Sequence, residues 1–471
     1  MPDYSALDWV KNTVFYQIFP ERFSNGDPGN DPPGTMSWDA APTADNYLGG
    51  DLQGIRDHLP YLEDLGVTAL YLTPIFKARL NHKYDTSDYF QVDPAFGTEE
   101  LLRDLVSEAH ERNMRIILDA VFNHCGDSFW AFEDLMSNGV NSPYKDWFFP
   151  TSLPVQQNPA NYQTCGGATF LPKLNVSNPQ VRAHLMKAAV HWLRETGIDG
   201  WRLDVPWKVP LEFWREVRKA VKATSPEAYI VAEAWRDTTY WLGDDPACDG
   251  VMNYPLRDYL LDYCVRDAMD AEDIDFFIHR QLAQHGVAAP YLLTLLGSHD
   301  TPRLLTMCKG DAARAILAVA MQFTLVGTPM IYYGDEVGME GREDPDNRRG
   351  MLWDSNTWNS AIYQAHRLLA QARRQHPALS AGGFETLLTF NGVYAYRRST
   401  PGDQVVVVIN PRQARQSLSL SISETAPSIW RDLFTGKIYE CDSGNLRIDQ
   451  MPSKQALVLF PVTNEQRRVI G

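Results

Sequence analysis

The chain of 471 residues lacks the features that mark several classes of protein. No apolar run reaches the roughly 18 residues of a membrane span, and the first residues, MPDYSALDWVKNTVFYQ, lack the basic start and apolar core of a secretion signal. Positive charge is scarce, since 43 Lys and Arg face 59 Asp and Glu, and no basic cluster stands out. We therefore expect no nucleic-acid partner, no membrane partner and a cytoplasmic location.

Cysteine is also sparse, and no two cysteines have C-x-x-C spacing. This pattern predicts neither a zinc site nor a disulfide framework, so we expect buried free thiols. With 44% hydrophobic and 22% charged residues, the composition is that of a globular protein with a large core. The six cysteines are Cys125, Cys165, Cys248, Cys264, Cys308 and Cys441.

Four segments share one pattern, an apolar run that ends in an acidic residue. They are RIILDAVFNH (115–124), GWRLDVP (200–206), YIVAEAW (229–235) and LLTLLGSHDT (292–301). Each indicates a buried parallel strand with a carboxylate at its C-terminal end, which is the chemical face of a closed (β/α)₈ barrel. The carboxylates that we expect to converge there are Asp119, Asp204, Glu233 and Asp300.

Strand-length apolar runs alternate with helical stretches along most of the chain. The runs lie near 14–20, 69–74, 116–121, 200–205, 229–234, 250–255, 292–297 and 330–335. Eight strands with intervening helices predict an α/β fold, the TIM barrel.

Two segments depart from the barrel pattern. Residues 123–176 are irregular and rich in Pro, Asn, Gly and aromatics, which predicts a small inserted domain after the third strand. After about residue 374, short alternating runs predict an antiparallel β-sandwich. The predicted division is 1–122 and 177–376 for the barrel, 123–176 for the insertion and 377–471 for the C-terminal domain.

The carboxylates suit cleavage of a glycosidic bond, which needs one acid and one ionised carboxylate. Arg202 and Asp204 lie two apart on a strand and point to one side, so we expect Arg202 to keep Asp204 ionised as a nucleophile. Glu233 follows the apolar run YIVA, which would raise its pKa and suit it to proton donation. Asp300, beside His299, could stabilise the distorted sugar ring. Any one of these acids could instead be a salt-bridged loop residue.

The chain resembles the α-amylase family, glycoside hydrolase family 13, and within it the neopullulanase, cyclomaltodextrinase and maltogenic amylase group. The similar segments cover nearly the whole chain, in the order that the family has them. They are VFYQIFPERFSNGDPGND, NHKYDTSDYFQVDPAFG, DAVFNH, LPKLN, GWRLDVP, VAEAW, LLGSHDTPR, GTPMIYYGDEVGMEG and DPDNRRGMLW.

The resemblance implies a role for each matching residue. Asp204 would be the nucleophile, Glu233 the general acid/base and Asp300 the transition-state stabiliser. The residues implied to contact the cleaved sugar are Tyr84, Asp119, His124, Arg202 and His299, and those implied to grip the next sugar are Asp344 and Arg348. On residue grounds alone, Tyr84 could be ordinary core and the two histidines could be satisfied core residues.

An Asn- and Asp-rich loop near the N-terminus offers hard oxygen ligands with glycines that allow turns. By itself such a loop could be a polar turn. The resemblance implies a structural Ca²⁺ site, whose ligands would be Asn25, Asp27, Asn30, Asp31, Gly49 through its carbonyl, and Asp51.

Two features depart from the family pattern. Most members of the group begin with an extra β domain that exchanges contacts in a dimer, whereas this chain starts almost at the first barrel strand. We therefore expect a monomer, or a homodimer without that swap, and a more open site for larger or branched glucans. After the nucleophile the chain reads VPWKV, where Trp207 and Lys208 would lie near the acceptor sugar, or would simply pack and be solvated.

The leading hypothesis is a retaining hydrolase that cleaves α-1,4 bonds of maltooligosaccharides, cyclodextrins, pullulan or starch, with possible transglycosylation and α-1,6 cleavage. A dextrin-debranching enzyme or an α-glucosidase on the same scaffold is the alternative, because specificity depends on loops. A non-catalytic relative associated with a transporter is a remote alternative, because such relatives lack the carboxylates that are present here.

Overall fold

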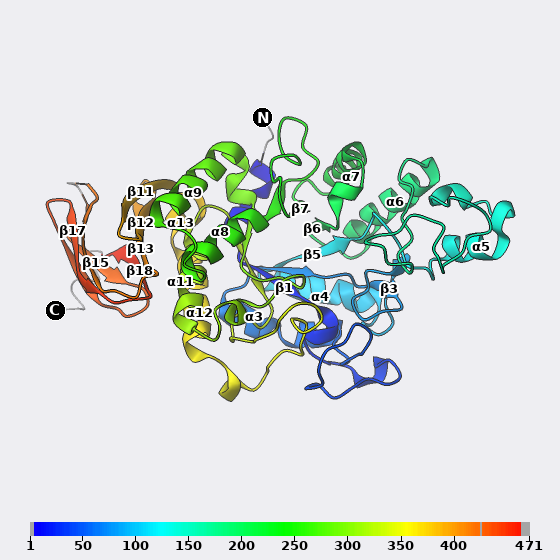
Figure 1. The fold of residues 1–471 in the computed structure, drawn as a ribbon, viewed down its shortest axis with the longest axis horizontal. Helices are drawn as coiled ribbons and strands as arrows, with labels where there is room; N and C mark the ends of the chain where they lie inside the picture. The colour runs from blue at the N-terminus through cyan, green and yellow to red at the C-terminus, as the bar shows by residue number, and fades with distance from the viewer. Residues whose placement is uncertain (1–3, 424–425, 463–471) are drawn as a thin grey trace.

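The computed structural model describes residues 4–423 and 426–462. Eight parallel strands close into a barrel, which confirms the predicted TIM-barrel class (Figure 1). Around the barrel the strands are β1 (Phe15–Ile18), β10 (Thr328–Tyr332), β9 (Leu293–Leu295), β8 (Gly250–Asn253), β7 (Tyr229–Ala234), β6 (Gly200–Leu203), β5 (Arg115–Ala120) and β2 (Ala69–Leu72). Each of the eight predicted runs overlaps one of these strands.

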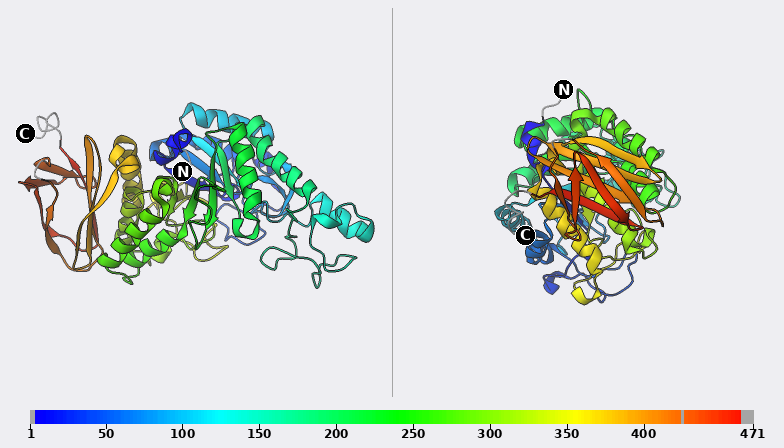
Figure 2. Two further views of the ribbon diagram at one scale, coloured as in Figure 1. Left: turned by 90° about the horizontal axis from the view of Figure 1, so that it is seen from above. Right: turned by 90° about the vertical axis from the view of Figure 1, so that its left-hand side faces the viewer.

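Helices follow the strands and surround the barrel (Figures 1 and 2). The longer ones are α2 (Leu52–Asp57), α3 (Leu59–Leu65), α4 (Glu99–Glu111), α6 (Pro179–Glu195), α7 (Leu211–Thr224), α8 (Tyr254–Cys264), α9 (Ala271–His285), α11 (Ala312–Thr324) and α12 (Ser360–Gln375). Short helices are α1 (Asp8–Lys11), α10 (Leu304–Met307) and α13 (Pro377–Ala381). Within 4–423 and 426–462, no helix is both long and apolar enough to cross a membrane.

Strand burial and register bring the acidic residues together. Every residue of β6 and β7 is buried, as expected for strands covered on both faces. The parallel pairing of β5 with β6 sets Asp119 opposite Arg202, and Asp204 follows β6 directly. Glu233 lies near the end of the adjacent strand β7. The C-terminal ends of these strands therefore place their polar residues at one mouth of the barrel.

The insertion after the third barrel strand forms the end of the molecule opposite to the C-terminal sheet (Figure 1). It contains helix α5 (Trp130–Asn138) and isolated antiparallel bridges, one of which joins His124 to Lys173. A further hairpin, β3 (Phe76–Ala78) with β4 (Thr86–Val92), lies between β2 and β5 and was not predicted.

The C-terminal domain is antiparallel, as predicted, and forms one end of the molecule (Figures 1 and 2). Its strands are β11 (Gly383–Phe390), β12 (Val393–Thr400), β13 (Asp403–Asn410), β14 (Gln416–Ser421), β15 (Ile429–Asp432), β16 (Ile438–Asp442), β17 (Asn445–Met451) and β18 (Gln455–Pro461). In β13 alternate residues serve two cores, since Val405 and Val407 join the barrel-side core while Val406 and Val408 join the core within the C-terminal domain.

The predicted domain boundaries fall between elements. Residue 122 follows β5, residue 176 precedes α6, and residue 376 separates α12 from α13. The exact limits of the domains stay predictions.

Candidate active site

Arg202 is the centre of the carboxylate cluster. Its buried guanidinium lies 3.1 Å from Asp119 Oδ1, 2.8 Å from Asp204 Oδ1 and 2.9 Å from Glu233 Oε2. The side chains are almost wholly buried. One fixed cation thus faces three acids that come from three adjacent strands.

The three acids do not keep ordinary pKa values. Burial raises the pKa of Asp204 well above its usual value; the charge of Arg202 lowers this pKa, and the charges of Asp119 and Glu233 raise it. Burial also raises the pKa of Glu233, to which the charge of Asp300 adds. That Arg202 keeps Asp204 ionised stays a prediction, because two neighbouring carboxylates share the same cation. Acids coupled in this way titrate as a group and not singly.

A hydrogen-bonded chain of side chains flanks this cluster. Gln17 Nε2 donates to His299 Nδ1 at 2.7 Å, which leaves the imidazole proton on Nε2. His299 Nε2 lies 2.7 Å from Tyr84 Oη, and Tyr84 donates in turn to Asp119 Oδ2 at 3.0 Å. Burial lowers the pKa of His299 well below its usual value, so the imidazole is neutral.

Asp300 Oδ2 lies 3.2 Å from Nε2 of His299, the same ring nitrogen that contacts Tyr84. Arg348 Nη2 is 3.4 Å from Asp300 Oδ1, and Nη1 is 3.1 Å from Asp344 Oδ1. Arg348 Nε donates to the His299 carbonyl at 2.9 Å. Arg348 therefore ties Asp344 to Asp300 at the mouth of the barrel.

His124 is buried, and its Nε2 has no hydrogen-bond partner among the described residues. Burial lowers its pKa to about 4, so it is a neutral imidazole. Its Nδ1 lies 3.2 Å from the Asn123 side-chain nitrogen. An unpaired buried ring nitrogen costs free energy that a sugar hydroxyl could recover.

An aromatic groove adjoins Glu233. A cavity of about 580 Å³ is lined by Trp207, Trp235 and Tyr240, whose exposed fractions are 47%, 38% and 56%. Trp207 lies in the short 3₁₀ turn Pro206–Lys208, which follows Asp204 closely in the chain. Exposed aromatic faces beside a carboxylate cluster are surfaces on which sugar rings stack.

Trp235 and Tyr240 were not predicted as site residues. Trp235 stands directly after the quoted VAEA run, and its proximity to Glu233 was a signal available in the sequence. Tyr240 lies in the loop after β7, where no local pattern reveals which side chains face the groove.

The predicted metal loop forms a separate cluster of oxygen atoms. Asn25 Nδ2 donates to Asp31 Oδ1 at 2.8 Å, and Asn30 Nδ2 donates to Asp51 Oδ2 at 3.0 Å. The amide oxygens of Asn25 and Asn30 are buried and have no hydrogen-bond partner among the described residues. At Gly49, with φ of +85°, a Cβ would collide with Asp31 and Asn25.

These oxygen atoms fit a hard cation, because two buried amide oxygens without hydrogen bonds lie in one loop with several carboxylates. Burial raises the pKa of Asp31, and the nearby charges of Asp51 and Asp27 add to the effect. The Asp51 carboxylate already accepts from the backbone nitrogens of Gly26, Asp27 and Gly54, so it also orders the loop. In the part of the chain that the structure describes, no group of three His, Cys, Asp or Glu could hold a metal, so an ion here would need the Asn and carbonyl oxygens.

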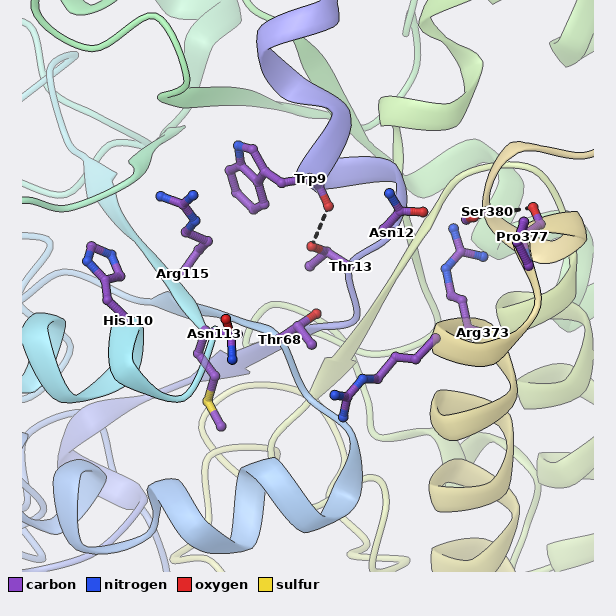
Figure 3. Close-up of a pocket in the computed structure, with 12 residues that line it drawn as sticks. Trp9, Asn12, Thr13, Thr68, His110, Asn113, Arg115, Arg373, Pro377 and Ser380 are labelled. Carbon is purple, nitrogen blue, oxygen red and sulfur yellow. Dashed lines mark hydrogen bonds between the residues drawn. The ribbon is translucent and has the colours of Figure 1, made fainter.

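A second cavity, of about 610 Å³, lies where the barrel strands begin (Figure 3). Thr13 and Thr68 precede β1 and β2, and Arg115 opens β5. Its lining includes Arg373 but neither Asp nor Glu among the described residues. This cavity therefore offers no acid pair and lies apart from the carboxylate cluster.

Comparisons with known proteins agree with this geometry. A family model described as alpha amylase, catalytic domain, matches residues 17–376, and one described as maltogenic amylase, C-terminal domain, matches residues 384–452. A cyclomaltodextrinase from Bacillus sp is 47% identical over 416 residues, which are 87% of this chain and 74% of that protein.

Two solved structures match almost end to end. The cyclic α-maltosyl-(1→6)-maltose hydrolase from Arthrobacter globiformis, in complex with that cyclic sugar, has a TM-score of 0.88 and 40% identity, covering 96% of this chain and 99% of that chain. The debranching enzyme from Nostoc punctiforme has a TM-score of 0.86 and 36% identity, with the same coverage of 96% and 99%. The chain belongs to the α-amylase family of glycoside hydrolases, in the group of the cyclomaltodextrinases, neopullulanases and maltogenic amylases.

Proposed function

We propose that the protein is a retaining hydrolase that cleaves α-1,4-glucosidic bonds of maltooligosaccharides, cyclodextrins, pullulan or starch, with transglycosylation and α-1,6 cleavage as further activities. The observation that carries this proposal is the contact of one buried guanidinium, Arg202, with three carboxylates. Because one cation faces three acids, each carboxylate that ionises makes ionisation of its neighbours less favourable. Glycosidic cleavage needs one protonated and one ionised carboxylate, and this arrangement suits such a pair.

The reaction would proceed in two steps. Asp204 attacks the anomeric carbon, the glycosidic C–O bond breaks, and Glu233 gives its proton to the leaving sugar oxygen. A water molecule then gives a proton to Glu233, attacks the anomeric carbon and frees Asp204. A sugar hydroxyl in place of this water would give transglycosylation. Asp300, held by Arg348 and His299, would stabilise the positive charge of the transition state.

The residues around the cluster would hold the cleaved sugar. Tyr84 offers its ring, and the hydrogen-bonded chain through His299 and Asp119 keeps that ring in place. His124 offers its unpaired Nε2 to a sugar hydroxyl. Asp344, fixed by Arg348, would bind the next sugar on the non-reducing side.

The aromatic groove would hold the leaving sugar. Trp207 is 47% exposed and lines the same cavity as Trp235, so its ring is available to a sugar bound beyond the cleaved bond. Lys208, next to it in the same turn, would lie near that sugar.

A debranching enzyme is the second candidate function. The Nostoc punctiforme debranching enzyme matches 96% of this chain and 99% of its own, and the Arthrobacter globiformis hydrolase is named for a cyclic sugar that contains 1→6 links. Both likenesses favour substrates in which α-1,6 bonds are present. The α-glucosidase alternative has no such support.

Ca²⁺ is proposed for the loop of Asn25, Asp27, Asn30, Asp31, Gly49 and Asp51, where it would tie the N-terminal loop to the start of α2. Two orphaned amide oxygens support it. A monomer, or a homodimer without the domain swap, and a cytoplasmic location stay predictions from the sequence.

Product analysis tests the proposed substrates. The purified protein is incubated separately with β-cyclodextrin, pullulan, soluble starch and a maltosyl-cyclodextrin, and the products are separated by chromatography. Ring opening with maltose or panose as product would support the leading proposal. Release of the side chain from an intact ring would favour debranching, and no cleavage of any of the four would refute both.

A further inference from the structure

The two oxygens of Glu233 have different surroundings. Oε2 accepts from the backbone nitrogen of Val205 at 2.9 Å and lies 2.9 Å from Arg202 Nη2. Oε1 accepts from the indole Nε1 of Trp235 at 2.6 Å. All three partners are donors.

This arrangement decides which oxygen can carry a proton. A proton on Oε2 would face both the Arg202 cation and the Val205 N–H, so protonation there is unfavourable. Oε1 meets a single neutral donor, Trp235, which occupies one of its two lone pairs. The other lone pair of Oε1 remains for the proton.

The indole is held firmly enough to position a neighbour. Its ring stacks on Tyr254 with centroids 3.8 Å apart and an interplanar angle of 14°. Tyr254 is buried, and its hydroxyl bonds Ser298 Oγ at 3.1 Å. Trp235 also lines the aromatic groove.

We propose that Trp235 is a positioning residue of the reaction: its indole N–H fixes Oε1 of Glu233 and leaves one lone pair of that oxygen for the proton that passes to the leaving sugar. The proposal rests on the role of Glu233 as general acid. It goes beyond that role, because Trp235 acts through a hydrogen bond to the acid and not through contact with the sugar.

The test is Trp235→Phe, which keeps an aromatic ring and removes the N–H. Loss of a donor to the ionised carboxylate destabilises that form, so the pKa of Glu233 rises. We expect the basic limb of the kcat/KM profile on maltotriose to move upward by about one pH unit, and kcat to fall about tenfold or more.

A substrate whose leaving group needs little protonation distinguishes a defect in proton donation from a defect in binding or folding. α-Maltosyl fluoride loses fluoride with little help from an acid, so we expect Trp235→Phe to retain its rate on this substrate within about threefold. The ratio of the two rates is taken within one preparation, so any unfolded fraction cancels. Equal losses on both substrates would overturn the proposal.

Trp207→Phe is the matched control, because Trp207 lines the same groove and makes no hydrogen bond to Glu233. We expect this variant to raise KM for maltotriose while its basic limb stays within about 0.2 pH units of the wild type. A Trp235→Phe profile that coincides with the wild type would refute the positioning role.

Failure of the proposed function would look different. If Glu233→Gln kept the basic limb and most of the activity, Glu233 would not be the acid, whatever Trp235→Phe does. If Glu233→Gln abolishes cleavage of maltotriose while Trp235→Phe leaves the profile unchanged, only the positioning proposal falls.

Discussion

Arg202 gives the site its electrostatic character. Its guanidinium contacts Asp119, Asp204 and Glu233, and all four side chains are almost wholly buried. Burial of three acids around one cation costs free energy in the native state. The arrangement that suits the acids to catalysis therefore lowers the stability of the folded protein.

At this scale we expect Asp204→Asn and Glu233→Gln each to lower kcat on maltotriose by about 10⁴-fold or more. Neither should lower the melting temperature, because each replaces an acid that competes for Arg202 with a neutral amide of similar shape. Steady-state kinetics and differential scanning calorimetry measure the two effects. Glu212→Gln, at a side chain that is 72% exposed, is the control and should change neither quantity.

Glu336 gives a prediction about pH and stability. It is fully buried, and burial raises its pKa to about 7 from 4.5, although Tyr16 and Tyr61 donate hydrogen bonds to its Oε1. The native state therefore binds this proton more tightly than the unfolded chain does. The resulting stability is fully present below about pH 4.5 and is lost as the pH rises to about 7.

Glu336→Gln removes this titration and keeps an oxygen that can accept from both tyrosines. We expect the free energy of unfolding of the variant, relative to the wild type, to rise by about 3 kcal/mol between pH 4.5 and 7 and to stay level above that range. Urea unfolding at a series of pH values measures it. A difference that does not depend on pH would contradict the buried, protonated state of Glu336.

At the scale of elements, the loop between β1 and α2 depends on its oxygen cluster. The Asp51 carboxylate caps α2 by accepting from Gly54 and also accepts from the backbone of Asp27. The amide oxygens of Asn25 and Asn30 accept no hydrogen bond from the described residues. An ion that satisfied them would join the loop to the helix.

We therefore expect chelation with EGTA to lower the melting temperature by several degrees, and added Ca²⁺ to restore it, because an ion that binds only the native state stabilises by mass action. Asn30→Ala should melt lower than the wild type in Ca²⁺ and show a smaller response to EGTA. Scanning calorimetry gives both values. If EGTA does not change the melting temperature of the wild type, the loop is a polar turn and not a Ca²⁺ site.

The sequence predicts the barrel strands better than the other elements, for physical reasons. Strands buried on both faces, such as β7, are continuous apolar runs and are easy to recognise. β11 is only partly buried along its length, so it has no clear alternation and was missed. The β3–β4 hairpin was missed too, because β3 has only three residues. The four acids at strand ends could be named from the sequence, whereas the position of Tyr240 in the groove depends on the conformation of a loop.

At the scale of the whole molecule, the barrel and the C-terminal domain share a core. β13 sends Val405 and Val407 into the barrel-side core and Val406 into the core of its own domain. Tyr263 of α8 donates to the carbonyl of Gly392 across the junction, at 3.0 Å. Neither domain can lose its structure without exposing the apolar surface of the other.

We expect the two domains to unfold in one calorimetric transition. Val407→Ala and Val406→Ala, on opposite faces of one strand, should each lower the stability by about 2 kcal/mol and shift that single transition. The exposed Ser419→Ala, in β14, serves as the control and should leave it in place. Two separate transitions, of which only one responds to Val406→Ala, would show that the domains unfold independently.

The single guanidinium that serves three carboxylates also limits how this enzyme can be engineered. Any substitution at Arg202 alters the surroundings of Asp204, Glu233 and Asp119 together. Trp207 and Tyr240 line the aromatic groove from two separate segments of the chain. Among the described residues, neither side chain forms a hydrogen bond with Arg202 or its three acids. Variation in linkage and chain-length preference can therefore accumulate on those two segments while the chemistry stays intact.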